Sequence, residues 1–169
     1  MTGISNDLAE KLNQEAEEYY VAHQENDRDK INSACRSIGL DTKGFDALGS
    51  GSGRNVFDMG ILGYEDLALK LAVPNKNYDG LQQNSRECEV WNKADRQQQD
   101  FLAEIVDHGT NNYWLIMRKG NSVDSVPYDW KKEAIYVLRD LVWDSDIRDE
   151  NIVEINGFHK LCDYGTPPQ

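Results

Sequence analysis

The most informative stretch of this sequence reads Asp146-Ile147-Arg148-Asp149-Glu150-Asn151, and Lys160-Leu161-Cys162-Asp163-Tyr164-Gly165 follows it closely. An aspartate and an asparagine stand five positions apart in the first segment, and Asp163 comes twelve positions after Asn151. Carboxylate and amide oxygens are ligands that suit magnesium. Any one of these acidic residues can equally be a charge on a solvated loop, so the ordered set carries the information.

A short hairpin is predicted between the two segments. Its strands are expected at Ile152–Ile155 and Phe158–Leu161. Asn156-Gly157 joins them, and because both residues tolerate positive φ they form a strong hairpin turn.

The residues upstream predict an antiparallel sheet combined with helices. Strands are expected at 45–51, 56–60, 67–73, 105–107 and 113–117, and helices at 81–94 and roughly 130–143. Apolar residues at helical spacing also predict a helical region over 6–38, which Asn26-Asp27 can break into two helices. We expect these helices to brace the main body; a partner-binding helix is the alternative.

A glycine-rich turn, Gly49-Ser50-Gly51-Ser52-Gly53, lies between the first two expected strands. Taken alone, such a run is more often a flexible linker. Between strands it can bring backbone N–H groups close to a polyphosphate, because glycine lacks a side chain and adopts unusual φ values.

Lys70 interrupts an apolar strand and would need a partner if it were buried. One interpretation is a lysine at a sheet edge, with its ammonium group in water. The other is an ion pair with a glutamate of the following helix, either Glu87 or Glu89.

Taken together and in this order, these features resemble the protein-kinase family over about residues 45–165. The resemblance implies an α+β, protein-kinase-like fold. It has a five-stranded antiparallel N-lobe sheet with an αC helix, an N-terminal helical extension and a much reduced C-lobe. The expected boundaries are residues 1–40 for the extension, 41–120 for the N-lobe with its hinge, and 121–169 for the minimal C-lobe.

The resemblance also implies roles in a site for ATP and Mg2+. Asn151 and Asp163 would hold the metal, and Asp146 would orient the acceptor hydroxyl and receive its proton. Arg148 would lie near the γ-phosphate, and Lys70 would contact the α- and β-phosphates with Glu87 as its ion-pair partner. The remaining nucleotide contacts would come from the glycine turn and the hinge: Gly49, Ser50, Gly51, Ser52, Gly53, Met117 as gatekeeper, Arg118, Lys119 and Gly120.

Several residues depart from the family pattern. Arg54 stands where the third glycine of the turn is usual, and Asp144-Ser145 replace the His-Arg that precedes the catalytic aspartate. In the family, a phosphorylated activation loop commonly binds to that arginine. This switch is missing here, so constitutive activity is expected. Thr166 to Gln169 leave no room for an activation segment. We therefore expect a minimal protein, similar to small kinases of bacterial effectors and phages, in preference to a fragment.

Composition narrows the remaining possibilities. The chain of 169 residues suits one domain, and its formal net charge of -12 disfavours nucleic-acid binding. No apolar stretch is long enough for a membrane span and no secretory signal is present, so a cytoplasmic location is expected, or a host cell if the chain is an effector or phage product. The cysteines Cys35, Cys88 and Cys162 are expected to be reduced thiols, and no zinc site is expected.

The favoured function is constitutive transfer of the ATP γ-phosphate to a Ser or Thr hydroxyl of a protein substrate. A pseudokinase or nucleotide-binding interaction module is the alternative from another class. A small-molecule phosphotransferase is a further alternative. The sequence leaves the identity of the substrate and the oligomeric state open.

Overall fold

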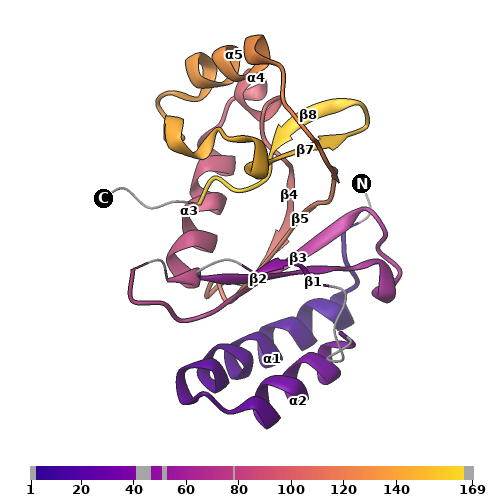
Figure 1. Ribbon diagram of the computed structural model, residues 1–169. Helices are drawn as coiled ribbons and strands as arrows, with labels where there is room; N and C mark the ends of the chain where they lie inside the picture. The colour runs from indigo at the N-terminus through magenta and orange to yellow at the C-terminus, as the bar shows by residue number, and fades with distance from the viewer. Residues whose placement is uncertain (1–2, 41–46, 51–52, 78, 166–169) are drawn as a thin grey trace.

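A computed structural model describes residues 3–40, 47–50, 53–77 and 79–165 and shows an α+β protein (Figure 1). Its main sheet has five antiparallel strands in the order β1-β2-β3-β5-β4. The strands are β1 (Ala47–Ser50), β2 (Arg54–Asp58), β3 (Leu67–Ala72), β4 (Ile105–His108) and β5 (Trp114–Arg118). The five strands and their antiparallel pairing agree with the prediction.

Two N-terminal helices, α1 (Asn6–Glu25) and α2 (Arg28–Ile38), lie together on one face of this sheet (Figure 1). The predicted break at Asn26-Asp27 is confirmed. Asn26 ends α1 in the left-handed region with φ of 55°, and the Asp27 side chain caps the first turn of α2 by accepting from the backbone N–H groups of Asp29 and Lys30.

The two faces of the sheet have different neighbours because side chains alternate along a strand. Leu67, Leu69 and Leu71 of β3 pack against α1 and α2, as do Trp114 and Ile116 of β5. Leu115 and Met117 of β5 point the other way and belong to a second apolar core. The sheet therefore separates two cores, and the N-terminal helices cover one of its faces.

The opposite face carries the helix α3 (Gly80–Lys93), which Asp79 caps by accepting from the Leu81 N–H. The short helix α4 (Arg96–Gln99) follows α3 along the chain. Gly80 is required at the start of α3, since a Cβ there would overlap the carbonyl oxygen of Gly53. Tyr20 of α1 donates to the Asp79 carboxylate at 2.6 Å, which links the N-terminal helices to the cap of α3.

The C-terminal part lies above the main sheet in Figure 1 and contributes residues to the second core. It contains α5 (Tyr128–Leu138) and a three-stranded sheet of β6 (Asn121–Ser122), β7 (Ile152–Ile155) and β8 (Phe158–Leu161). The predicted hairpin of β7 and β8 is confirmed, with Asn156 and Gly157 at φ of 53° and 81°. Two 3-10 turns, Asp144–Asp146 and Asp149–Asn151, lead into it.

Two predicted boundaries were wrong. The helix expected to reach residue 143 ends at Leu138, because Leu141 and Val142 both donate to the Leu138 carbonyl in a closing turn before the chain becomes extended at Trp143. The strand expected at 56–60 is Arg54–Asp58, since Gly60–Leu62 forms a 3-10 turn. Within the described ranges, no helix is both long and apolar enough to cross a bilayer.

Candidate active site

Lys70 lies in the centre of the main sheet, not at an edge. Its strand β3 runs between β2 and β5, where Lys70 stands opposite Val56 and Leu115, and its side chain is only 6% exposed. The ammonium group donates to both carboxylate oxygens of Glu87 at 2.9 Å and to the carbonyl oxygen of Cys162 at 2.6 Å. The edge interpretation was therefore wrong, and the buried ammonium is held by charge-assisted hydrogen bonds.

Glu87, not Glu89, is the partner of Lys70. The Glu87 side chain has no exposed surface, whereas that of Glu89 is about half exposed and lies 3.7 Å from both Arg86 and Lys93. Glu87 also accepts from the backbone N–H of Tyr164 at 3.2 Å. The helix α3 thus connects the strand lysine to the segment that contains Asp163.

Arg54 also belongs to the cluster of charged residues around Glu87 and Asp163, and the sequence analysis did not identify it as a member. It was noted only as a lost glycine, but its buried guanidinium group bonds to Asp163 at 2.5 Å and to Glu87 at 3.1 Å, and it reaches the Asn84 side chain at 3.4 Å. Its position directly after the glycine turn does not by itself indicate these contacts, because both carboxylates are far away in the sequence. Burial acts against the charge on Arg54, yet the two carboxylates raise its pKa above the ordinary value.

Asp163 follows β8 and lies within reach of both cations. Its side chain is 48% exposed, so part of the carboxylate faces solvent. Burial alone would raise the pKa of Asp163, but the charges of Arg54 and Lys70 outweigh this and hold the pKa below its usual value. Asp163 is therefore an anion at neutral pH.

Asp146 and Asn151 are tied to the same segment through the backbone. The Asn151 amide nitrogen donates to the Asp146 carbonyl at 3.0 Å, and the Asn151 carbonyl accepts from the Cys162 N–H at 2.8 Å. Both side chains are buried. A continuous chain of hydrogen bonds thus runs from the Asp146 loop through Cys162 to Lys70.

Tyr164 anchors this segment in the second core. Its ring is buried, and its hydroxyl donates to the Ala103 carbonyl at 3.0 Å. Gly165 follows, and a Cβ there would lie 2.5 Å from the Gln83 carbonyl oxygen, so the backbone approaches α3 as closely as glycine permits. The backbone that follows Asp163 is thereby held against α3 and the second core.

Asn151 and Asp163 carry the kinds of oxygen that magnesium prefers. The side-chain nitrogen of Asn151 donates to Asp146, so its side-chain oxygen, Oδ1, is the atom that could bind a metal. Asp163 supplies a partly exposed carboxylate. Among the described residues, no cluster of three His, Cys, Asp or Glu side chains gathers as a metal site. Only Oδ1 of Asp163 is bound by Arg54, so a metal that used this oxygen would have to displace the guanidinium group.

Arg148 lies outside the cluster around Asp163. Its side chain is exposed and its nearest ion-pair partner is Glu150 at 3.3 Å. The structure therefore gives no contact between Arg148 and the cluster around Asp163.

The expected glycine turn is only partly described. Gly51 and Ser52 lie outside the described residues, as does Phe45 at the predicted start of the first strand. Gly49 lies exposed in β1. Gly53 accepts from the Val73 N–H at 2.8 Å, which places the end of the turn beside the start of α3.

The expected hinge connects the two sheets. Met117 is buried in the second core, and the backbone N–H groups of Arg118 and Lys119 donate to Glu104 and Asp66 at 2.9 and 2.8 Å. These two amides are engaged within the protein, so they do not serve adenine in this state. Gly120 lies against β7, where a Cβ would come within 2.7 Å of the Glu154 carbonyl oxygen.

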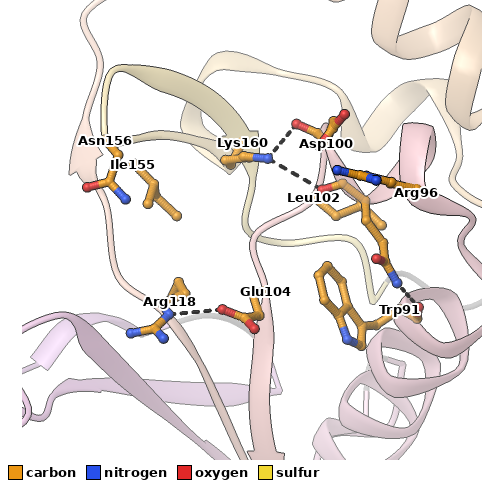
Figure 2. A pocket seen from close by; sticks show the side chains of 10 residues that line it. Trp91, Arg96, Asp100, Leu102, Glu104, Arg118, Ile155, Asn156 and Lys160 are labelled. Carbon is orange, nitrogen blue, oxygen red and sulfur yellow. Dashed lines mark hydrogen bonds and ion pairs between the residues drawn. The ribbon is translucent and has the colours of Figure 1, made fainter. Parts of the chain in front are cut away.

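Two hollows of about 380 and 560 Å³ lie beside the hinge, away from the cluster. Both are lined by Glu104, Arg118, Ile155 and Asn156. Figure 2 shows the smaller one, between the Arg118–Glu104 ion pair and Lys160, which donates to the Asp100 carbonyl. Neither hollow is lined by Lys70, Glu87 or Asp163.

Comparison of the sequence with protein-family models finds no match, and a comparison with curated proteins finds none either.

Proposed function

We propose that this chain is a minimal kinase that transfers the γ-phosphate of ATP to a Ser or Thr hydroxyl of a protein. The observation that carries the proposal is the position of the Lys70 ammonium group, between the Glu87 carboxylate and the carbonyl of the residue before Asp163. Phosphoryl transfer of the kinase type requires a strand lysine paired with a helical glutamate, next to a metal-binding aspartate. The order and pairing of the strands around Lys70 support the same assignment.

Each residue would have a defined task. Lys70 would bind the α- and β-phosphates, and Glu87 would hold the Lys70 side chain in place. Asp163 and Asn151 would bind the magnesium ion, which when present neutralises charge on the phosphate oxygens. Asp146 would orient the acceptor hydroxyl and take up its proton.

Transfer of labelled phosphate from ATP tests this function. Because general-base catalysis contributes about 10²–10⁴-fold, Asp146→Asn is expected to lower the rate by at least about 10²-fold. Asp163→Asn is expected to abolish transfer through loss of a metal ligand. The matched control is Asp144→Asn, which neutralises an exposed carboxylate two positions before Asp146 and should leave the rate unchanged.

The labelled product separates the enzymatic alternatives. Label in protein, either an added substrate or the chain itself, supports the proposed function. Label found only in a small molecule would mean that the acceptor is a small molecule and not a protein. Label that survives both Asp146→Asn and Asp163→Asn would refute the residue assignments.

A second candidate function is a nucleotide-binding interaction module that does not transfer phosphate. The pairing of Arg54 with Asp163 favours it, because the guanidinium group already compensates the charge that a catalytic metal would neutralise. Binding of nucleotide without any transfer of label, under conditions that saturate the site with Mg2+, is the outcome that supports this alternative.

A further inference from the structure

Arg54, Lys70, Glu87 and Asp163 form one electrostatic unit. Glu87 is shared, since it lies 2.9 Å from Lys70 and 3.1 Å from Arg54, and Arg54 bridges from it to Asp163 at 2.5 Å. Two cations and two anions balance within the cluster. The negative charge of Asp163 is therefore already compensated without a metal ion.

The two cations differ in what they hold. Lys70 donates to Glu87 and to a backbone carbonyl, whereas Arg54 is the ion-pair partner of Asp163. Glu87 keeps Lys70 as a partner if Arg54 moves away. Release of Arg54 from Asp163 therefore leaves no buried carboxylate without a cation, which makes the release energetically feasible.

We propose that Arg54 is a metal-competing residue, whose guanidinium group occupies the Asp163 carboxylate until a divalent cation with its nucleotide displaces it. This inference rests on the proposed metal and nucleotide site. It makes Arg54 a determinant of metal affinity: the wild-type chain binds a divalent cation more weakly than its ligands alone would, because a metal that uses Oδ1 of Asp163 must first break a charge-assisted hydrogen bond.

Binding of Mn2+ in the presence of a fixed concentration of AMP-PNP measures this competition. The concentration of free Mn2+ is determined by electron paramagnetic resonance. Loss of one charge-assisted hydrogen bond at Asp163 predicts that Arg54→Gln binds Mn2+ about tenfold more tightly than wild type. Arg54→Lys keeps the competing charge and is expected to bind with nearly wild-type affinity. Arg86→Gln is the matched control, because Arg86 lies on α3 and donates to the Leu141 carbonyl outside the cluster.

The Asp163→Asn background shows whether the effect acts through this carboxylate. There, Arg54→Gln is expected to leave Mn2+ affinity unchanged, since nothing remains for the arginine to block. Equal or weaker Mn2+ binding by Arg54→Gln than by wild type would overturn the proposal, and so would a tenfold gain that persists in the Asp163→Asn background.

A measurement on the wild-type chain avoids any question of folding. The guanidinium NMR signals of Arg54 are expected to shift when Mg2+ and AMP-PNP are added together, because the bond to Asp163 is lost. Unchanged Arg54 signals, while the amides of Cys162 and Asp163 shift on binding, would contradict the displacement but leave the proposed function standing. Absence of Mn2+ and nucleotide binding in wild type and in Arg54→Gln alike would refute both.

Discussion

Glu87 is the residue on which the charge balance of the cluster depends. It is fully buried and is the carboxylate that Lys70 and Arg54 share. We therefore predict that Glu87→Gln lowers the free energy of unfolding by about 3–5 kcal/mol, as expected when one member of a buried ion pair is removed. Urea denaturation measures the change.

Glu89→Gln is the control for this substitution. Glu89 is exposed on the same helix, and its ion pairs at 3.7 Å lie in water. The expected loss is under about 0.5 kcal/mol. Equal losses for the two variants would contradict the assignment of Glu87 as the partner of Lys70.

Tyr164 gives a second prediction at the same scale. The Tyr164 hydroxyl bonds to the Ala103 carbonyl. Tyr164→Phe is expected to destabilise the protein by about 1 kcal/mol, because one buried hydrogen bond is lost. Thermal unfolding compared with Tyr136→Phe, whose ring is exposed, measures it; no difference between the two variants would mean that the hydroxyl contributes nothing.

Single residues show what the sequence could and could not predict about the site. An ion pair of Lys70 was predictable because a charge inside an apolar strand needs a partner, and the next helix offered Glu87 or Glu89. Arg54 was not, because its role depends on which side chains the folded chain brings to the start of β2. The choice between Glu87 and Glu89 likewise required the burial of each side chain.

At the scale of elements, hydrophobic periodicity predicted the helices and strands well. The strands of the main sheet alternate between two cores, and the helix break at Asn26-Asp27 follows from residues that favour the left-handed region and the N-cap. Boundaries were less predictable. The apolar Leu141 and Val142 continue the pattern of α5 although the helix ends at Leu138.

The packing of α1 on the sheet gives a prediction at this scale. Leu12 is fully buried in the core that α1 and α2 share with β3 and β5. Leu12→Ala is expected to cost about 2–5 kcal/mol. It should also speed hydrogen exchange in β3, because the helices and the sheet share one core.

The control for Leu12→Ala is Val21→Ala, which shortens a partly exposed side chain on the same helix. We expect it to leave exchange in β3 unchanged. If Leu12→Ala accelerated exchange only within α1 and α2, the N-terminal helices would be an independent unit and not a brace.

At the scale of the whole molecule, burial of the cysteine thiols makes the free energy of unfolding fall at alkaline pH. Desolvation raises the pKa of Cys35, Cys88 and Cys162 to about 11 from an ordinary value of 9.0. A raised pKa means that the folded chain keeps protons that the unfolded chain releases. The stabilisation is therefore complete below about pH 9 and is lost as pH rises through the folded values.

Chemical denaturation at pH 7.5, 9 and 10.5 measures this loss. We predict that the free energy of unfolding falls steadily above pH 9, and that Cys88→Ala makes the decline shallower. A stability that stays constant up to pH 10.5 would mean that the thiols are accessible to water in the folded protein.

The central claim is that Lys70 and Asp163, which lie 93 positions apart in the sequence, serve one nucleotide with its metal. Isothermal titration of Mg2+ and AMP-PNP into wild type, Lys70→Met and Asp163→Asn measures this most directly. The account predicts one binding site in wild type and at least about tenfold weaker binding in each variant, since each removes a charge that contacts the phosphates or their metal. Wild-type affinity in either variant, or no binding by the wild-type chain, would contradict it.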